Sequence, residues 1–401
     1  MQRSNWKRMF FLIYTGQAFS LLGSAAVQFA IIWWLTVQTE SAITLTAATI
    51  ASFLPNLLLG PFAGVWIDRY PRRTVMMAAD ALVALSSAAL GAAFLQPGWP
   101  PIWFVFLMLF VRGVGNTFHA PAMQAAIPML VPPELLAKAG GWGNLIVSIS
   151  TLLGPALGAL LMARLPLAPI MLVDIAGAAF AIVCLLMVTI PEIPPQREKQ
   201  HLWADLQQGI RAMGDNKPLM AAFFPILAAS VLYMPLGALF PLLVRVHYQG
   251  GAWHNAVVEC VFSGGLLLSS LAMGLWGSMK RRFLMIASAI GALGLAAFAG
   301  GILPPEGFWG FAVCCLVMGA SGTFFNVPLV AHIQETVAPK QMGKVLSLLT
   351  TAMTLATPIG LVLAGPISEA AGVRRWFAGS GLLMAAAGLL CFLTTRRYDK
   401  G

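Results

Sequence analysis

Ionisable side chains within long apolar segments are the residues of this sequence that are best suited to chemistry. Asp80, Asp174 and Glu259 each fall in such a segment, and Arg112 falls in another. Burial favours the protonated form of a carboxyl group and a nearby arginine favours the ionised form, so these groups can bind and release protons. We predict that the three carboxylates carry protons, with Arg112 as their charge partner. For Asp80, a structural pair with the arginines of the neighbouring loop is the alternative.

Arg112 begins a polar face on its predicted helix. Asn116 and His119 follow it at i+4 and i+7 and therefore share that face. Because a charged side chain that faces lipid is costly, we expect Arg112 to face the interior of a helix bundle or a water-filled cavity. The alternative is that it reaches along its helix to the membrane surface. His119 is suited either to carrying a proton or to a buried, hydrogen-bonded structural role.

A stripe of polar side chains marks the first apolar segment. Its members recur at spacings of three and four residues, and they are Gln17, Ser20, Ser24 and Gln28. A polar stripe on a membrane helix lines a cavity or contacts other helices, and we predict that this stripe, with Asn116 and His119, lines the substrate cavity. A large lipophilic substrate also needs aromatic and apolar neighbours. The candidates for this part of the pocket are Tyr233, Met234, Trp142 and Phe325, with Asn326 beside them.

Composition identifies the elements that hold these residues. Of the 401 residues, 59% are hydrophobic and 9% are charged, whereas soluble domains are about 25% charged. A helix needs about 20 apolar residues to cross a bilayer. Twelve such segments are predicted, at residues 9–36, 44–67, 74–95, 102–127, 140–163, 168–190, 218–244, 255–277, 284–303, 309–334, 344–368 and 374–395.

The basic residues predict how these segments cross the membrane. Most of the 24 Lys and Arg residues fall on one side if both termini are cytoplasmic. This asymmetry accounts for the net charge of +10 without nucleic acid. The first apolar segment is too long for a cleaved signal peptide, so we expect it to remain as a helix. The five cysteines lie in apolar segments without metal-ligand spacing, and we predict that they are packing residues, with no metal and no cofactor.

A polar stretch from Pro191 to Pro218 divides the chain. The prediction is a six-helix half at 1–190, a cytoplasmic linker at 191–217 and a second six-helix half at 218–401. The linker contains an amphipathic segment at about 202–213, which is typical of a helix on the membrane surface. Glu335, at the end of a predicted span, is expected to lie at the interface.

The two halves resemble each other in the order and spacing of their Gly, Pro and Arg residues. At an offset near 207, Gly115, Pro121 and Pro132 match Gly322, Pro328 and Pro339, and Gly64 with Arg72-Arg73 matches Gly274 with Arg281-Arg282. A duplicated six-helix unit is typical of transporters that bind substrate at the interface of the repeats.

The segment Gly64-Val65-Trp66-Ile67-Asp68-Arg69-Tyr70-Pro71-Arg72-Arg73 lies between the second and third spans. It resembles the signature of the major facilitator superfamily, with Trp66 and Pro71 as departures. The resemblance implies a gating motif made of Gly64, Asp68, Arg69, Arg72 and Arg73. Asp68 would pair with arginines across the seam between the two halves and hold the cytoplasmic gate closed; charge that only sets topology is the alternative.

Two further motifs resemble those of the same superfamily. Arg112-Gly113-Val114-Gly115-Asn116 is similar to its fourth-span motif, which is implicated in proton coupling, with Val114 in place of Gln. Gly154-Pro155-Ala156-Leu157-Gly158 is similar to a reduced antiporter motif, in which Gly154, Pro155 and Gly158 remain. Small residues there permit close helix packing, and the proline permits a kink.

Other segments resemble the macrolide-efflux branch of this superfamily along the whole chain. They include Asn5-Trp6-Lys7-Arg8, Phe118-His119-Ala120-Pro121-Ala122 and Phe240-Pro241-Leu242. The resemblance implies an all-α membrane protein of 12 transmembrane helices with the major facilitator fold. It implies proton-coupled export of a small-molecule drug, most specifically a macrolide, from a bacterial inner membrane, by a protein expected to be monomeric. Export of a siderophore or another amphiphile, or import of a nutrient by the same scaffold, is the alternative.

Enzymatic functions find no support in the sequence. It has no nucleophile elbow, no metal-ligand cluster, no phosphate-binding glycine loop and no Walker sequence. We therefore expect a transporter, driven by an ion gradient and not by ATP.

Overall fold

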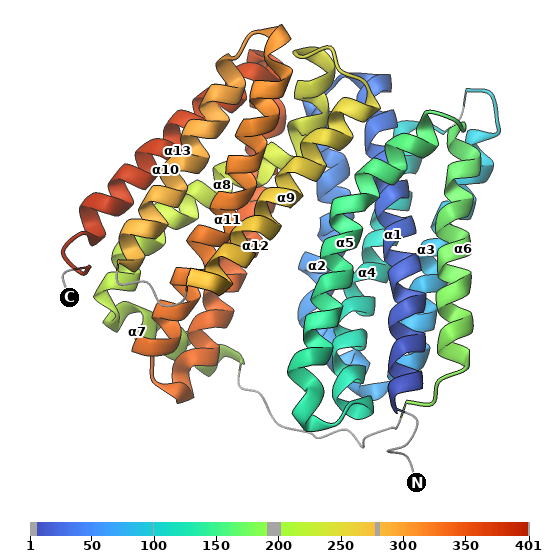
Figure 1. Ribbon diagram of the computed structural model, residues 1–401, viewed down its shortest axis with the longest axis horizontal. Coiled ribbons are helices and arrows are strands. Elements are labelled where there is room, and N and C mark those ends of the chain that lie inside the picture. Colours follow the sequence, from blue (N-terminus) through green and yellow to red (C-terminus); the bar gives the residue numbers. More distant parts are fainter. Residues whose placement is uncertain (1–5, 99, 191–201, 277–280, 400–401) are drawn as a thin grey trace. The chain divides into compact units, whose positions relative to one another are not determined.

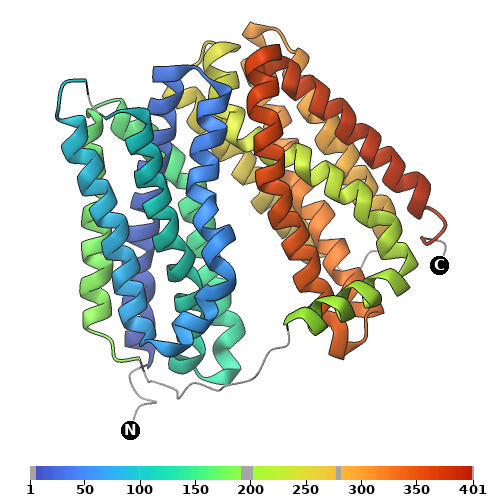
Figure 2. The same cartoon turned by 180° about the vertical axis from the view of Figure 1, so that it is seen from behind.

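The computed structural model describes residues 6–98, 100–190, 202–276 and 281–399 (Figures 1 and 2). All regular secondary structure in these ranges is helical, so the all-α prediction is confirmed. Twelve helices in the described ranges are long and apolar enough to span a membrane. The chain is therefore a multi-pass membrane protein.

The first six spans and the linker helix come first along the chain. They are α1 (Trp6–Thr39), α2 (Ala42–Arg69), α3 (Arg72–Phe94), α4 (Ile102–Leu130), α5 (Leu136–Met162), α6 (Leu167–Leu186) and α7 (Leu202–Asp215). The other spans are α8 (Lys217–Val246), α9 (Ala252–Trp276), α10 (Arg282–Ile302), α11 (Phe308–Thr336), α12 (Pro339–Ala371) and α13 (Val373–Thr395). Short 3-10 turns, η1 (Pro133–Leu135) and η2 (Pro305–Gly307), precede α5 and α11.

Each predicted span corresponds to one helix, and most helices begin before the predicted apolar segment, whereas α6 ends at Leu186, four residues before the predicted end at 190. The predicted span 344–368, for example, lies within α12, which runs from Pro339 to Ala371. Hydropathy detects only the part of a helix that needs a hydrocarbon solvent, whereas its polar ends continue the same backbone hydrogen bonding in the interface.

The chain divides into two compact units. The first contains the described residues of Met1–Gln38 and Ala47–Arg197, and the second contains those of Thr39–Thr46 and Glu198–Gly401. In the first unit α3 packs on α4 and α6, and in the second α10 packs in the same way on α11 and α13. The two sets of six spans are thus built alike.

Glycines at corresponding positions create the same close helix contacts in both units. A Cβ on Gly113 of α4 would lie 2.4 Å from the Ser52 carbonyl oxygen of α2, and one on Gly319 of α11 would lie 2.0 Å from the Phe262 carbonyl oxygen of α9. Gly113 and Gly319 are 206 residues apart in the chain. Only a residue without a side chain lets these helices approach so closely. The predicted pseudo-repeat is therefore confirmed in its packing.

Helix α7 is the helix expected between the two sets of spans. It packs on α12 and α8 within the second unit. Ala212 and Met213 are buried there, and the Lys344 ammonium group donates a hydrogen bond to Gln208. One face of α7 is therefore covered by protein.

Candidate functional site

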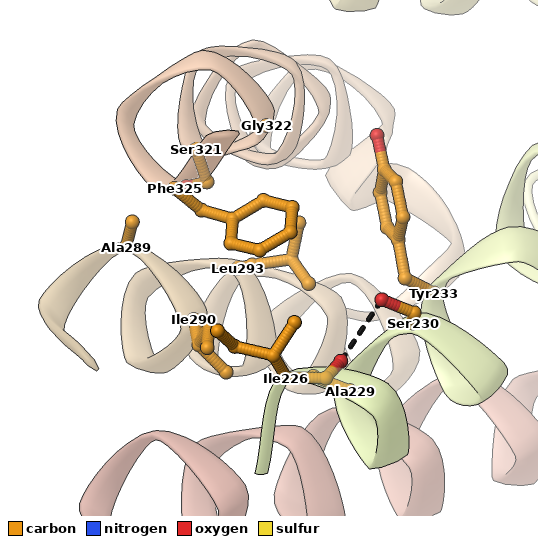
Figure 3. Close-up of a pocket in the computed structure, with 10 residues that line it drawn as sticks. All are labelled: Ile226, Ala229, Ser230, Tyr233, Ala289, Ile290, Leu293, Ser321, Gly322 and Phe325. Atoms are coloured by element: carbon orange, nitrogen blue, oxygen red, sulfur yellow. Dashed lines mark hydrogen bonds between the residues drawn. The ribbon is translucent and has the colours of Figure 1, made fainter. Parts of the chain in front are cut away.

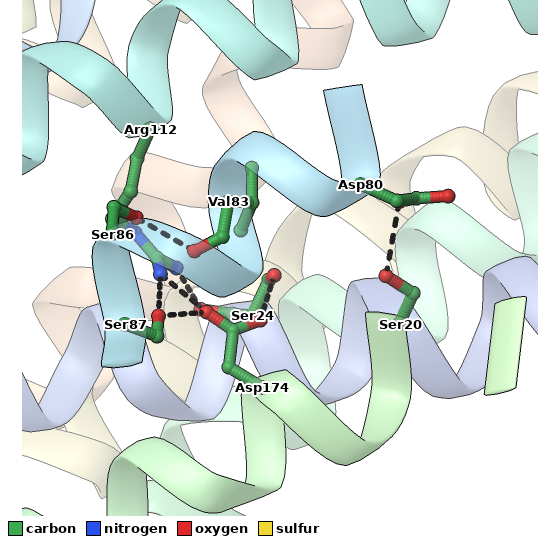
Figure 4. A network of polar contacts seen from close by, with 8 residues as sticks. All are labelled: Ser20, Ser24, Asp80, Val83, Ser86, Ser87, Arg112 and Asp174. Atoms are coloured by element: carbon green, nitrogen blue, oxygen red, sulfur yellow. Dashed lines mark hydrogen bonds and ion pairs between the residues drawn. The ribbon is translucent and has the colours of Figure 1, made fainter. Parts of the chain in front are cut away.

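The interior of the first unit contains an ion pair between α4 and α6. Arg112 donates to the Asp174 carboxylate, and 4% of the Arg112 side chain and 0% of the Asp174 side chain are exposed. The Ser24 and Ser87 hydroxyls donate to the same carboxylate at 2.5 and 2.6 Å (Figure 4). Arg112 also donates to the Ser87 hydroxyl at 2.6 Å and to the Ser24 carbonyl oxygen at 3.3 Å. Arg112 thus faces the interior of the helix bundle and does not reach to the surface.

A second buried carboxylate, Asp80 of α3, lies in a different environment. Gln17 and Ser20 of α1 donate to its two oxygens at 3.2 and 3.4 Å. His119 Nε2 of α4 lies 3.7 Å from Asp80 Oδ1. In the described structure, Asp80 thus contacts α1 and α4, and the loop arginines make other contacts. Arg72 contacts Asp68 and Arg73 contacts the Leu186 carbonyl oxygen, so Asp80 is not paired with either of them.

The polar stripe of α1 therefore donates hydrogen bonds to the two carboxylates. Gln17 and Ser20 contact Asp80, and Ser24 contacts Asp174. Gln28, further along the same helix, is half-buried. The stripe on α1 reaches both α3 and α6, because Ser20 donates to Asp80 of α3 and Ser24 donates to Asp174 of α6 (Figure 4).

Asn116 differs from the two residues with which it was predicted to share a face. Its side chain is exposed, whereas Arg112 and His119 are buried. Successive residues of an α-helix are about 100° apart, so Asn116 lies about 60° around the helix from His119. That rotation is enough to place Asn116 outside the packed interior.

The second unit holds the remaining carboxylate candidate and the aromatic candidate. Glu259 of α9 accepts a hydrogen bond of 2.8 Å from Asn255, one turn earlier. Tyr233 lines a small pocket of about 30 Å³ between α8, α10 and α11 (Figure 3). Phe325 lines the same pocket, whereas the neighbouring Asn326 is exposed. A pocket of this volume accommodates about one water molecule.

The predicted gating motif lies at the end of α2 and the start of α3. Asp68 pairs with Arg72 at 3.3 Å, and the Asp68 side chain is 62% exposed. Arg73 donates to the Leu186 carbonyl oxygen at the end of α6 at 2.9 Å. Gly64 and Arg69 are exposed. Within the first unit, the motif thus joins α2, α3 and α6.

The Gly-Pro-x-x-Gly segment of α5 packs on α1. A Cβ on Gly154 would lie 2.4 Å from Ala25 Cβ, and one on Gly158 would lie 2.7 Å from the Ala26 carbonyl oxygen. Pro155 is buried within α5. These small residues allow α5 to lie directly against the polar stripe helix.

Two residues of these polar clusters were not predicted from the sequence. Ser87 bridges Arg112 and Asp174, and Asn255 contacts Glu259. A signal for each was present, because Ser87 lies seven residues after Asp80 and Asn255 lies four residues before Glu259, which places each pair on one helix face.

The fold and the buried charges within its spans define a membrane transporter. The chain matches the model of the Major Facilitator Superfamily over residues 13–356 and 253–401. It belongs to that superfamily.

Similarity to characterised members extends over almost the whole chain. It is 37% identical over 391 residues to the macrolide efflux protein A of Streptococcus pyogenes, covering 97% of this chain and 96% of that protein. It is 27% identical over 373 residues to the multidrug efflux pump Tap of Mycobacterium tuberculosis, covering 89% and 86%.

Solved transporter structures share the fold. A bacterial homologue of the iron transporter ferroportin in an inward-facing state superimposes with a TM-score of 0.72 at 18% identity, covering 98% of this chain and 99% of that one. A bacterial homologue of the lysosomal transporter Spinster gives a TM-score of 0.71 at 14% identity, covering 100% and 99%. At these identities the likeness concerns the fold alone.

Proposed function

We propose that this protein exports lipophilic drugs, most specifically macrolide antibiotics, from a bacterial cell in exchange for protons. The observation that carries the proposal is the 37% identity to a macrolide efflux protein over 97% of the chain. The same scaffold, with substrate at the interface of two repeats, supports alternating access. Siderophore export is an outcome of the test below.

Buried ionisable groups supply the proposed coupling to protons. Asp80, Asp174 and Glu259 are the carboxylate candidates, and Arg112 is the charge partner. Charged side chains are costly in hydrocarbon, so they persist within spans where they serve a pathway for ions or protons. Gln17, Ser20 and Ser24 contact two of these carboxylates, and we assign them to positioning these groups.

The remaining sequence predictions complete the proposal. Asp68, with Gly64, Arg69, Arg72 and Arg73, acts as the cytoplasmic gate motif. Gly154, Pro155 and Gly158, which resemble the antiporter motif of the superfamily, support exchange of the drug for protons. Asn116, Gln28, Tyr233 and Asn326 are candidates for contacting the drug, and His119, which lies beside Asp80, is a candidate for contacting the drug or for carrying a proton. The halves are 1–190 and 218–401, joined by a cytoplasmic linker at 191–217, in a monomer with both termini in the cytoplasm.

Drug susceptibility tests the proposal directly. An efflux-deficient bacterium expressing the chain is grown against macrolides and against unrelated drugs, with Arg112→Ala as a matched variant at equal expression. Raised tolerance to macrolides that the variant does not confer supports the proposal. Inverted membrane vesicles add the energetics, because macrolide accumulation that an uncoupler abolishes requires the proton gradient. If expression of the chain leaves tolerance to every macrolide unchanged and the vesicles accumulate a siderophore, the substrate is the siderophore and not a macrolide.

A further inference from the structure

The two buried carboxylates of the first unit differ in their access to a permanent positive charge. Asp174 has the Arg112 guanidinium beside it. Arginine stays protonated in proteins. The guanidinium therefore balances the charge of the carboxylate, and no additional proton is needed to make the pair neutral. The Ser24 and Ser87 hydroxyls further saturate the Asp174 oxygens. Nothing in this arrangement requires Asp174 to bind a proton.

Among the residues that the structure describes, Asp80 has no arginine or lysine partner. It is 5% exposed, and two of its contacts, with Gln17 and Ser20, are to uncharged groups. The remaining contact is with the His119 ring, 3.7 Å away. Histidine is the side chain whose charge changes most readily near neutral pH.

His119 has no competing partner in the described structure. It is 8% exposed, and its Nε2 atom is a buried nitrogen without a hydrogen bond. Converting the 3.7 Å separation into a charge-assisted hydrogen bond of about 2.8 Å requires an approach of about 1 Å. One proton placed between His119 Nε2 and the Asp80 carboxylate would give both buried groups a hydrogen-bond partner.

The charged and titratable groups around Asp80 are few. In the part of the chain that the structure describes, Asp80 meets Gln17 and Ser20 from α1 and His119 from α4, and the Arg112–Asp174 pair joins α4 to α6 nearby. Since that pair is neutral, the charge of the cluster is set by whether Asp80 and His119 share a proton. Without the proton the two side chains carry one negative charge, and with it they carry none.

We propose that Asp80 and His119 form one proton-binding site that holds the exchanged proton during transport, beside the Arg112–Asp174 ion pair. This inference rests on the proton-coupled export proposed above. A proton from water on the outer side binds to Asp80 Oδ1 or to His119 Nε2. It later passes to water on the cytoplasmic side, which leaves the carboxylate and the neutral imidazole. Hydrocarbon favours the neutral, loaded pair, and water access favours release.

Infrared titration of the purified full-length protein tests this assignment without any drug. A protonated carboxyl group has a C=O stretching band that a carboxylate lacks, so a difference spectrum between wild type and a variant isolates one titrating residue. Asp80→Asn is expected to remove one component. His119→Gln is expected to keep that component and to move its midpoint by about one pH unit or more, as in coupled sites. Ser86→Ala, on the same helix with a hydroxyl bonded only to Val83, is the control and leaves the spectrum unchanged.

The same titration identifies the rival assignments. The proposal is overturned if the titrating C=O band is kept in Asp80→Asn. It would then be lost in the Arg112→Gln/Asp174→Asn double variant or in Glu259→Gln. An unchanged midpoint in His119→Gln overturns the sharing of the proton. The double variant is used because it removes both charges together, so that no buried charge is left unpaired.

Transport in liposomes provides the second readout, with erythromycin as the macrolide. Asp80→Asn is expected to lose accumulation driven by a pH gradient and to keep exchange of labelled for unlabelled erythromycin at equal pH, because exchange needs no release of the proton. Accumulation at the wild-type level in Asp80→Asn overturns the proposal. If the wild-type protein transports no erythromycin at all, the macrolide assignment fails, and the infrared titration still decides the proton site.

Discussion

Arg112 and Asp174 form an ion pair that joins α4 to α6 in the interior of the first unit, with both side chains almost fully buried. A buried pair contributes little relative to an apolar pair of the same size, but removal of one partner leaves the other charge unpaired in a low-dielectric interior. The two residues are 62 positions apart, so their contact depends on tertiary packing.

We expect Arg112→Ala to abolish drug efflux while the protein still inserts in the membrane. The variant leaves Asp174 buried without its cation, at a cost of about 3–5 kcal/mol of stability. Drug tolerance at equal expression measures the first effect, and thermal unfolding of the purified protein measures the second. Wild-type tolerance in the variant would remove Arg112 from the mechanism.

A double variant separates charge from packing. In Arg112→Gln/Asp174→Asn both charges are absent and both side chains retain hydrogen-bonding groups for Ser24 and Ser87. We expect its unfolding temperature to lie above that of Arg112→Ala. Equal unfolding temperatures for the two variants would show that the unpaired charge is not the source of the destabilisation.

The repeated glycines give a second prediction, on packing alone. Gly113→Ala and Gly319→Ala each place a methyl group within 2.4 Å of a backbone oxygen on the neighbouring helix. We expect each to lower the free energy of unfolding by about 1–3 kcal/mol, as other overpacked substitutions do. Gly140→Ala is the matched control, because a Cβ there meets no atom within 4 Å and alanine is the better helix former by about 0.5–1 kcal/mol. A loss of stability in the control equal to that of the other two would refute the packing explanation.

The spans could be predicted from the sequence because hydrocarbon imposes a minimum apolar length on every helix that crosses it. Even the short break between the fifth and sixth spans is seen, since α5 ends at Met162 and α6 begins at Leu167. The glycine and proline matches between the halves indicated a duplicated unit, but the close contact that recurs is made by another pair, Gly113 and Gly319, whereas the matched Gly115 and Gly322 meet different helices.

The pairing of the charges could not be predicted. Asp80, Asp174 and Arg112 lie on three different helices, and hydropathy does not determine how each helix is rotated about its axis. The stripe on α1 indicated a polar seam without indicating which carboxylates face it. Helical spacing also grouped Asn116 with Arg112 and His119, although a rotation of about 60° from His119 is enough to expose it.

Asp68→Asn tests the gate motif. Asp68 pairs with Arg72 across the turn between α2 and α3, and an exposed pair of this kind adds little to stability. Since the proposed gate depends on the charge of Asp68, we expect its loss to shift the conformational balance toward the inward-open state. Since the pair is exposed, we expect little change in unfolding temperature. Reactivity of single cysteines with reagents added from each side of the membrane measures the shift. Glu134→Gln, another exposed acidic residue, is the control, and accessibility equal to that of wild type in Asp68→Asn would count against a gate.

The last prediction concerns Asn216, which stabilises the start of α8. Its Oδ1 atom accepts a hydrogen bond from the Leu219 backbone nitrogen at 3.1 Å and so caps the helix. Its Nδ2 atom donates to the Thr336 hydroxyl at the end of α11 at 2.8 Å. Asn216→Ala removes these two interactions and a longer contact of 3.4 Å between Asn216 Oδ1 and His332 Nε2, at about 1 kcal/mol for the cap and about 1 kcal/mol for the hydrogen bond to Thr336.

Asn216→Asp distinguishes the two interactions. The aspartate keeps an oxygen for the cap and places a negative charge at the N-terminus of α8, which favours the helix, but it loses the donor to Thr336. We therefore expect thermal unfolding to follow the order wild type, Asn216→Asp, Asn216→Ala, from most to least stable. Hydrogen exchange at the first turn of α8 should be faster only in Asn216→Ala, because only that variant loses the cap. Equal exchange in both variants would mean that the contact with α11, and not the cap, holds the start of this helix.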